Sequence, residues 1–327
     1  MLNRLLNWIW YSNSFVGILL YPLSLLFRLI IFFRKLYFLH IINKPNFPNT
    51  PIVIIGNLTL GGTGKTSFII WLANTLSKSN IKVGIISRGY KGSYSGNPTN
   101  VNSKSNPFVV GDEAVMISKK TNCRVVVAHN RVDAAKYIIN DDIDILLSDD
   151  GLQHYAMKRD FEFIMIDGKR GLGNGMCLPA GPLREPASRI KKANSVIINE
   201  GDFTYSNAIK TTMKVDGVRQ IEGTTIKQIE DFSRTTVHAV AGIGNPSSFF
   251  DLLRDYSINV IEHPLPDHAN ITSNDLLFDD NFPVFITDKD AIKYNFSISK
   301  NIWVVEVFLN FKENDTRYII NSIMELI

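Results

Sequence analysis

The first 111 residues of this 327-residue chain contain no aspartate or glutamate. The same stretch holds eleven lysines and arginines, whereas the rest of the chain holds 24 basic and 31 acidic side chains, so the net charge of +4 is unevenly distributed. Uncompensated positive charge of this kind is typical of proteins that bind phosphate, whether on a nucleotide, a nucleic acid or an anionic lipid. Charge alone leaves all three partners open.

Cysteine is scarce as well. Cys123 and Cys177 are far apart and form no CxxC pair or Cys/His cluster, which excludes a disulfide framework and a zinc site of the usual spacing. We expect both to be small buried apolar residues, and the chain suits a reducing, cytosolic compartment.

Polar residues are nearly missing from the stretch 15–33, "FVGILLYPLSLLFRLIIFF", where only Gly17, Pro22, Ser24 and Arg28 are not bulky and apolar. Its 19 residues approach the length that spans a bilayer, but Arg28 lies well inside it and Pro22 would kink a helix. Spanning the membrane and lying in its interface are therefore both open. No small-residue cleavage site follows, which excludes a removable signal peptide. The alternative, a buried core helix, is disfavoured because no polar face balances the apolar one.

Aromatic and cationic residues of the kind that anchor proteins at a membrane surface surround this stretch. They are Arg4, Trp8, Trp10, Tyr11, Tyr21, Arg34 and Lys35. We therefore interpret residues 1–44 as a membrane-anchoring segment, followed by a Pro- and Asn-rich linker over 43–51.

Beyond the linker, short apolar runs alternate with helix-like stretches, a pattern typical of βαβ units and a mostly parallel α/β sheet with helices on both faces. The expected strands are 52–55, 82–87, 124–128, 143–148, 162–166 and 195–199, and the expected helices are 65–77, 113–119 and 131–139. These elements form a predicted nucleotide-binding domain over residues 45–210, and the strand 195–199 would close its sheet.

A smaller C-terminal α/β lobe is predicted over residues 211–327. It opens with a short β excursion at 211–229 and continues with strands at 237–241, 259–261, 284–287 and 303–308. Between them lies a helix that Asn245 can cap and Pro246 can begin.

Glycine is concentrated in "TLGGTGKTS", Thr59–Ser67, directly after the first expected strand. A phosphate cradle needs glycines that let backbone amides approach one point, a helix N-terminus, a lysine for the β- and γ-phosphates and a hydroxyl for magnesium. Lys65 and Thr66 supply the last two. The full set is Thr59, Leu60, Gly61, Gly62, Thr63, Gly64, Lys65 and Thr66. Only the leading glycine of a strict Walker A motif is missing, since Thr59 takes its place, and a plain glycine-rich turn is the alternative.

Two adjacent carboxylates, Asp149 and Asp150, follow the apolar run 143–147 in "IDILLSDDGLQH". This is the pattern of a Walker B strand, whose terminal carboxylate faces magnesium directly or through water. Neighbouring carboxylates repel each other unless a cation is near, although an Asp-Asp-Gly turn is the alternative. The guanine-recognition tetrad has no match, because "TDKD" at 287–290 has its letters in the wrong order, so ATP is favoured over GTP.

Transfer of a phosphoryl group to an alcohol requires a base, and two residues are candidates. Asp112 is expected at a helix N-cap, where the helix dipole would make it a weak base by itself. His268 follows Asp267 in a loop of the second lobe, and a His–Asp pair across the cleft would be a better base. Further polar residues are expected at strand ends or beside the acidic pair, with a solvated surface position as the alternative for each. They are Arg88, Gln153, His154 and Arg184.

A set of longer motifs, taken together, resembles the tetraacyldisaccharide 4'-kinase (lipid A 4'-kinase) family. In chain order they are "GNLTLGGTGKTS", "SRGYKG", "GDEAVMI", "SDDGLQH", "RGLGNGMCLPAGPLREP", "VAGIGNPSSFF", "PDH" and "ITDKDAIK". The resemblance covers nearly the whole chain and is far more specific than a P-loop alone.

The resemblance implies a P-loop kinase that transfers the γ-phosphate of ATP to the 4'-hydroxyl of a tetraacylated disaccharide 1-phosphate at the cytoplasmic face of the inner membrane. It implies lipid partners and no nucleic acid. Residues 59–66 would bind ATP, Asp112 and His268 would form the catalytic dyad, and Thr66, Glu113 and Asp150 would lie beside Mg²⁺. The second lobe would close the cleft on ATP.

The chain departs from the family pattern near His268, where Leu265 and Ala269 replace an aromatic residue and a second histidine, so the neighbouring substrate contacts differ. The main rival hypothesis is a membrane-docked P-loop ATPase switch of the assembly or partitioning type. Leu60 stands where those proteins carry a signature lysine, which favours the kinase. A membrane-bound nucleotide sensor without catalysis is a second rival.

Overall fold

The computed structural model describes residues 2–12, 14–41, 45, 47, 49–139, 142–294 and 301–327. The expected linker over 43–51 lies partly outside the described residues, and so does the side chain of Arg4.

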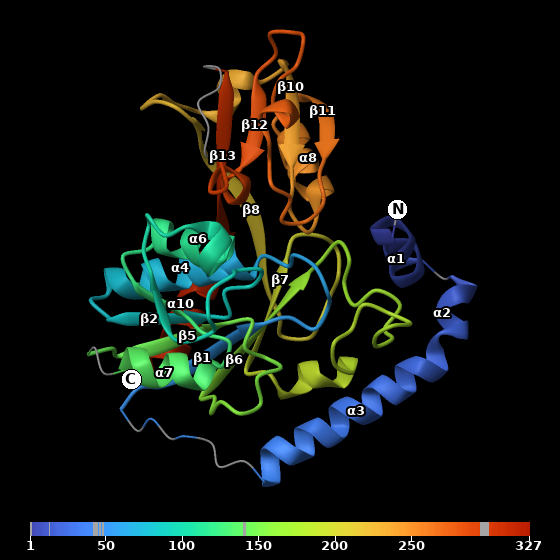
Figure 1. The fold of residues 1–327 in the computed structure, drawn as a ribbon, viewed down its shortest axis with the longest axis vertical. Helices are drawn as coiled ribbons and strands as arrows, with labels where there is room; N and C mark the ends of the chain where they lie inside the picture. Colours follow the sequence, from blue (N-terminus) through green and yellow to red (C-terminus); the bar gives the residue numbers. More distant parts are fainter. Residues whose placement is uncertain are drawn as a thin grey trace.

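One continuous mixed sheet runs through the whole molecule in the order β11-β10-β12-β13-β8-β7-β6-β1-β5-β2-β4-β3, with β9 paired to β8 (Figure 1). Its strands are β1 Ile52–Gly56, β2 Val83–Ser87, β3 Thr99–Val101, β4 Arg124–Val127, β5 Ile145–Asp149, β6 Phe161–Asp167, β7 Ser195–Asn199, β8 Ile209–Gln220, β9 Ile226–Lys227, β10 Thr236–Ala241, β11 Asn259–Pro264, β12 Val284–Thr287 and β13 Ile302–Phe311. Most neighbours pair in parallel, so the expected P-loop α/β class is confirmed. Strand β3, inside the long loop after β2, was not predicted.

The strand 195–199 does not close the first sheet, so that expectation is wrong. Strand β7 pairs in parallel with β8, and β8 pairs antiparallel with β13 along most of its length. The long β8 and β13 thus form a two-stranded ribbon that carries the sheet from the first lobe into the second. An open edge at β7 would have left a row of unpaired backbone groups, and β8 satisfies them.

Helices cover both faces of the sheet. They are α1 Leu2–Tyr11, α2 Phe15–Leu19, α3 Tyr21–His40, α4 Lys65–Lys78, α5 Pro107–Val110, α6 Asp112–Lys120, α7 Arg131–Ile139, α8 Pro246–Asp255, α9 Asp288–Ala291 and α10 Glu313–Met324, with short 3-10 turns at Ala187–Lys192, Ile229–Phe232 and Ser273–Asp275. In the first lobe, Val53 and Ile55 of β1 face the core under α4 and α6, whereas Ile52 and Ile54 face the core under α7. Because these strands are buried on both faces, they have continuous apolar runs in the sequence.

The C-terminal helix α10 packs on the first lobe, although the chain reaches it from the second. Its Ile319 and Ile323 are fully buried in the same core cluster as Phe68 of α4. The second lobe has a core of its own, in which Phe250 and Leu253 of α8 meet the strands β10, β12 and β13. A division at residue 211 therefore leaves α10 packed with the lobe that precedes it.

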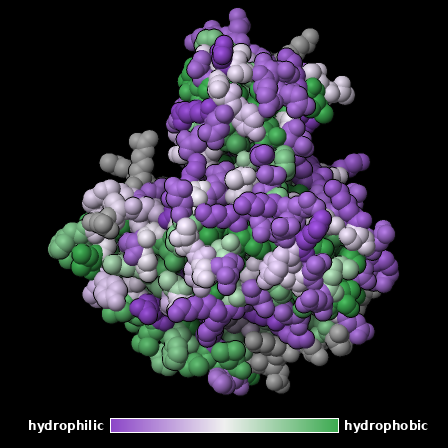
Figure 2. Space-filling model, turned by 180° about the vertical axis from the view of Figure 1, so that it is seen from behind, coloured by the Kyte–Doolittle hydropathy of each residue, from purple (hydrophilic) through white to green (hydrophobic). Residues whose placement is uncertain are grey.

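The N-terminal helices lie along the outside of the first lobe, where α3 runs past it with one face uncovered (Figure 1). Ser24 is buried and donates to the carbonyl of Cys177 at 2.8 Å, which fixes α3 on the lobe. Its outward side exposes large apolar residues, and hydrophobic surface gathers at the lower left edge of Figure 2, where α2 and α3 lie. They include Leu23, Leu25, Leu26, Leu29, Ile30, Phe32 and Phe33. Among the described residues, no helix is both long and apolar enough to cross a membrane.

The start of α8 shows how the lobes meet. Pro246 begins the helix as expected, but Asn245 does not cap it through its side chain. Instead its Nδ2 atom donates to Oδ2 of Asp167 at the end of β6, at 3.4 Å. Asn245 thus occupies the expected N-cap position, but its side chain is used in a contact between lobes that local sequence does not reveal.

Candidate active site

A cavity of about 700 Å³ lies between the two lobes, at the carboxyl ends of the parallel strands β1, β2, β5 and β6. This is where ligands bind in open α/β sheets. The cavity is lined by the whole loop 59–66 and by most of the other residues singled out from the sequence. These others are Arg88, Glu113, Asp149, Asp150, Gln153, His154, Arg184 and His268. Asp112 is the exception, because it lies behind His268 and does not line the cavity.

The loop 59–66 connects β1 to α4 and has the backbone of a phosphate cradle. Gly61 and Gly64 have φ angles of 105° and 87°, which residues other than glycine rarely adopt. A Cβ on Gly64 would also lie 2.8 Å from Nδ2 of Asn199. Within the described part of the chain, the backbone amides of residues 61–66 donate no hydrogen bond. Consecutive free amides at a helix N-terminus form an anion site.

The missing leading glycine of the loop is compensated by contacts with a distant segment. Thr59 forms an antiparallel bridge with Leu183, and the amide of Leu60 donates to the carbonyl of Pro182 at 3.0 Å. Thr59 therefore lies in an extended, buried position in which a side chain is tolerated. The same pairing brings the "GPLREP" segment, with Arg184, to the edge of the cradle.

Asp150 is held by two cations of the cavity. Both of its oxygens accept from Arg184 at 2.9 Å, and Nζ of Lys65 lies 3.6 Å from Oδ1. Burial would raise the pKa of Asp150, but the charges of Lys65 and Arg184 outweigh it and hold that pKa well below its ordinary value. A bidentate Arg–carboxylate pair is geometrically strict, so Asp150 positions Arg184 and Lys65 at the mouth of the cradle.

Asp149 has a contrasting environment one residue earlier. It is 2% exposed, its Oδ2 accepts from Ser87 at 3.0 Å, and its Oδ1 is buried without a hydrogen-bond partner among the described residues. Burial raises the pKa of Asp149 to about 7, and the charges of Glu113 and Asp150 add to the rise. A buried carboxylate oxygen without a partner favours a nearby cation.

The residues around Asp149 fit magnesium. Thr66 at the start of α4 and Glu113 on α6 line the same cavity, so a hydroxyl and two carboxylates face one space. Within the described ranges, no group of three or more His, Cys, Asp or Glu side chains is close enough to hold a metal alone. Magnesium usually binds through one or two carboxylates, waters and substrate phosphates, so such a preformed protein cage is not required.

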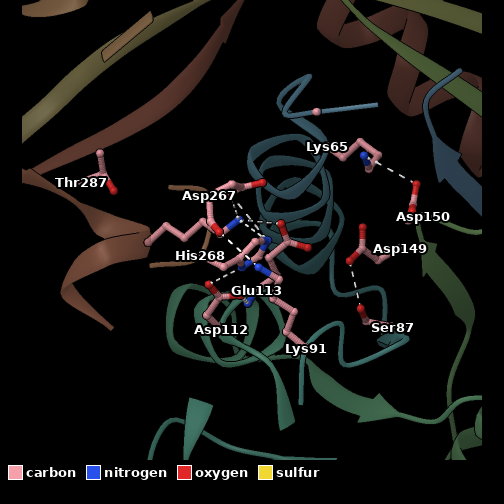
Figure 3. A network of polar contacts seen from close by, with 12 residues as sticks. Lys65, Ser87, Lys91, Asp112, Glu113, Asp149, Asp150, Asp267, His268 and Thr287 are labelled. Carbon is pink, nitrogen blue, oxygen red and sulfur yellow. Dashed lines mark hydrogen bonds and ion pairs between the residues drawn. The ribbon is translucent and has the colours of Figure 1, made fainter. Parts of the chain in front are cut away.

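The second lobe contributes a histidine to the cavity wall. Nδ1 of His268 lies 2.8 Å from Oδ2 of Asp112, and both side chains are buried (Figure 3). Burial would raise the pKa of Asp112, but the hydrogen bond from His268 and the charge of Lys289 lower it overall. An ionised Asp112 keeps the proton of the imidazole on Nδ1, which leaves Nε2 toward the cavity as the acceptor. Asp112 is the first residue of α6 and not its N-cap, which is Gly111, so the expected position is wrong by one residue.

Lys289 of α9 completes this side of the site. Its Nζ lies 2.9 Å from Glu113 and 3.4 Å from Nε2 of His268, and it is 4.0 Å from Asp267. Burial would lower the pKa of Lys289, but Glu113 and Asp112 raise it above its ordinary value, so the ammonium stays charged. A cation beside Nε2 lies where negative charge develops when an alcohol is deprotonated.

The remaining expected residues line the cavity and differ in their hydrogen bonding and exposure. Nε2 of Gln153 donates to Oε1 of Glu185 at 3.1 Å, so the amide is oriented by a buried carboxylate. His154 has a buried Nε2 without a hydrogen-bond partner in the described structure. Arg88 follows β2 and exposes its side chain to the cavity.

Sequence reasoning missed Ser87, Lys289 and Asn199. Ser87 and Asn199 end the strands β2 and β7, and only the order of strands in the sheet places them beside Asp149 and Gly64. Lys289 lies in "ITDKDAIK", a motif noted only as part of the resemblance. Its polar cluster after a buried strand was the available signal.

Comparison with known proteins identifies relatives of this chain. A family model described as tetraacyldisaccharide-1-P 4'-kinase matches residues 16–325. The chain is 43% identical over 301 residues to a tetraacyldisaccharide 4'-kinase of Nitrosococcus oceani, which covers 90% of this chain and 87% of that protein. It is 41% identical over 311 residues to a protein of the same name from Legionella pneumophila (strain Corby), covering 93% of each. Its fold is similar to that of LpxK from Aquifex aeolicus, solved in complex with ATP, with a TM-score of 0.75, 25% identity and coverage of 92% of this chain and 97% of that one.

Proposed function

We propose that this chain, which belongs to the tetraacyldisaccharide-1-P 4'-kinase family, transfers the γ-phosphate of ATP to the 4'-hydroxyl of a tetraacyldisaccharide 1-phosphate, the step of lipid A biosynthesis that forms lipid IVA. The observation that supports it most is the position of His268. A residue of the second lobe, backed by Asp112, lines the same cavity as the phosphate cradle of the first.

The donor end of the reaction is assigned to the loop 59–66. Its free amides and the N-terminus of α4 would hold the phosphates of ATP, and Lys65 would reach the β- and γ-phosphates. Arg184, paired with Asp150, would stabilise the negative charge that develops as the γ-phosphoryl group is transferred and ADP leaves.

Magnesium would neutralise the charge of the β- and γ-phosphates. We assign Asp149, Thr66 and Glu113 to its neighbourhood, directly or through water. Asp150 was expected beside the ion, but both of its oxygens accept from Arg184, so we assign it to positioning Arg184 and Lys65 instead.

The acceptor end of the reaction is assigned to His268. Nε2 would take the proton of the 4'-hydroxyl as the oxygen attacks the γ-phosphorus, while Asp112 stabilises the imidazolium that forms. Asp112 does not line the cavity, and its Oδ2 contacts His268 while its Oδ1 accepts from the amide of Glu113, so it acts as a positioning residue. Lys289 would stabilise the attacking oxygen.

We further propose that the chain works at the cytoplasmic face of the inner membrane, with α2 and α3 in contact with anionic lipids. The exposed apolar side of α3 and the basic residue Lys35 on the same helix support this location. Acyl chains could then stay in the bilayer while the sugar enters the cavity, which avoids transferring many CH₂ groups to water at about 0.8 kcal/mol each.

The test incubates the detergent-solubilised protein with γ-labelled ATP, Mg²⁺ and tetraacyldisaccharide 1-phosphate, and follows the label. Label in the lipid, dependent on His268, is the expected result. Release of labelled phosphate at the same rate with and without the acceptor would contradict it and point to an ATPase switch.

A further inference from the structure

The acceptor of the proposed reaction carries a phosphate of its own. If the proposed function holds, the accepting 4'-hydroxyl lies on one sugar and the 1-phosphate on the other, at the far end of the disaccharide. The first end must reach His268 and the cradle. The end that carries the 1-phosphate needs a cation elsewhere in the cavity. This inference rests on the proposed function, because the proposed function identifies the acceptor.

The cavity extends to the N-terminal segment. Arg34, near the end of α3, is the one residue of the described helices α1–α3 that lines it. Between Arg34 and the cradle, the cavity wall includes His154 and Gln153, whose Nε2 reaches the carbonyl of Asn57 beside the loop 59–66 at 3.4 Å. The cavity therefore joins the phosphate cradle to the helix whose outer side is apolar.

Most cations of the cavity already have partners. Lys65 and Arg184 pair with Asp150, Lys289 pairs with Glu113, Lys169 pairs with Asp251, and Arg131 donates to the carbonyls of Asp149 and Asp150. Arg34 and Arg88 have no acidic partner among the described residues. A guanidinium without a carboxylate partner is available to an anionic ligand.

Arg88 belongs to the donor end. It directly follows Ser87, whose hydroxyl donates to Asp149 beside the cradle. Arg34 lies on α3, so it is the unpaired cation of the cavity that the membrane-facing helix itself contributes.

Two aromatic rings position the guanidinium of Arg34. Its Cζ lies 5.9 Å from the ring centre of Tyr155, which is 5% exposed, and 6.0 Å from that of Phe38 on the next turn of α3. Contacts of this kind hold a guanidinium without neutralising it. The donors of Arg34 therefore remain free to form hydrogen bonds to a ligand in the cavity.

His154 reports the electrostatic potential of this wall. Burial, and then the charges of Arg131, Arg159, Arg34 and Arg88, lower the pKa of His154 to about 4. The imidazole is thus neutral at physiological pH, in a region where positive charge exceeds negative charge. Such a region attracts a phosphate and disfavours an uncharged sugar end.

We propose that Arg34 binds the phosphate on the distal sugar of the acceptor, so that the membrane-contacting helix α3 itself selects acceptors with a 1-phosphate. The enzyme then grips the two ends of the disaccharide with two parts of the chain: His268 of the second lobe at the hydroxyl and Arg34 of the N-terminal segment at the phosphate.

The chain offers a matched control in Lys35. Its Nζ lies 5.4 Å from the ring centre of the same Tyr155, but Lys35 does not line the cavity. Arg34→Gln and Lys35→Gln each remove one positive charge from the same turn of α3. An effect through membrane attraction would follow either change, whereas an effect through the cavity requires Arg34.

The experiment measures transfer by full-length wild type, Arg34→Gln, Arg34→Lys and Lys35→Gln in neutral detergent micelles. Two acceptors are compared, the tetraacyldisaccharide 1-phosphate and the same lipid without its 1-phosphate. We expect Arg34→Gln to raise KM for the phosphorylated acceptor roughly 10- to 100-fold, the loss expected for a charged hydrogen bond. The KM for the unphosphorylated acceptor, the KM for ATP and kcat should change by about twofold or less, and Arg34→Lys should recover part of the loss.

Three results would overturn the proposal. The first is an equal rise of KM for both acceptors in Arg34→Gln. The second is the same rise in Lys35→Gln. The third is a loss that appears only in vesicles with anionic lipid and not in neutral micelles, which would assign Arg34 to a bilayer headgroup. If wild type phosphorylates neither acceptor, the proposed function itself fails, and that outcome is distinct from all three.

Discussion

Nδ1 of His268 lies 2.8 Å from Oδ2 of Asp112, across a sequence separation of 156 residues and across the boundary between two lobes. Residue 268 has a positive φ of 60°, and its amide donates to the carbonyl of Gly242 at 3.0 Å, so a tight loop holds the imidazole in this orientation. The base is thus built only when the second lobe is seated on the first.

Asp112→Asn should lower kcat about 10²- to 10⁴-fold while leaving the Kd for ATP unchanged, because Asp112 does not line the cavity that the loop 59–66 lines. Steady-state kinetics and ATP binding by calorimetry measure both. A variant with wild-type kcat would contradict the dyad.

Lys289 should contribute to the transition state and little to binding of either substrate. Lys289→Met should lower kcat about 10²- to 10³-fold, the cost of losing one preorganised donor at a developing charge, with small changes in both KM values. Lys289→Arg should retain more activity, since it keeps the charge. A change confined to KM would instead assign Lys289 to substrate binding.

The raised pKa of Asp149 predicts that the stability of the protein depends on pH. Its folded-state pKa of about 7 lies above the ordinary value of 3.8, so the folded state binds this proton more tightly than the unfolded state. Without metal, the stabilisation that this group gives the wild type is fully present below pH 3.8, its ordinary pKa. It is lost as the pH rises through the folded-state pKa of about 7. Asp149→Asn should lack this decline, so its Tm relative to wild type should increase across that range in thermal melts.

Mg²⁺ should reverse this decline in the wild type, because the ion competes with the proton for Asp149. The rise of Tm with Mg²⁺ should be larger above pH 7 than below pH 6 and absent in Asp149→Asn. Ser87→Ala, which removes the hydroxyl that orients the carboxylate, should weaken Mg²⁺ binding about 10- to 100-fold. An equal Mg²⁺ response in Asp149→Asn would assign the ion to other residues.

Gly64→Ala should abolish ATP binding, and backbone strain alone should not account for this loss. Its φ of 87° is strained for alanine, and a Cβ there would lie 2.8 Å from Nδ2 of Asn199, so the Asn199 side chain would have to move. Gly175 is the control, since its φ is 73° but a Cβ there would meet nothing within 4 Å. Both alanine variants should lose about 1 to 2 kcal/mol of stability, and only Gly64→Ala should lose ATP binding by calorimetry. Equal ATP affinities in the two variants would contradict the cradle.

The apolar side of α3 should determine membrane association. Leu26→Glu places a charge on a residue that is 55% exposed, and it should markedly reduce co-flotation with anionic vesicles. Tyr318→Glu on α10, where the residue is 56% exposed, is the control and should float as wild type does. Equal flotation of both variants would contradict a membrane role of α3.

The donor half of the site could be predicted from sequence because its parts are neighbours in the chain. Gly64, Lys65 and Thr66 lie in the loop and helix start that follow one strand. The glycines of this loop indicate a backbone with positive φ angles. Asp149 could be predicted for a similar reason, since a carboxylate after an apolar run ends a buried strand.

The acceptor half depends on which elements meet across the sheet. Neither Asp112 nor His268 reveals its partner through spacing. A His–Asp pair across the cleft could be suggested from the chemistry of a base, but the resemblance to a family was needed to assign it to these two residues. The continuation of the sheet from β7 to β8 was missed because the charged and polar residues of Ile209–Gln220 obscure a long strand. Arg34 was read only as a membrane anchor, because nothing in a helical run shows that its side chain enters a cavity.

The position of α10 has a consequence for how the protein is made. Ile319 and Ile323 fill a core that Val53 and Ile55 of β1 also line, so that core stays incomplete until residue 323 has been synthesised. On the ribosome, the apolar helices α1–α3 emerge first and wait for nearly the entire chain before the lobe that carries them can finish packing. Early contact with the bilayer would shield these helices from aggregation throughout that interval.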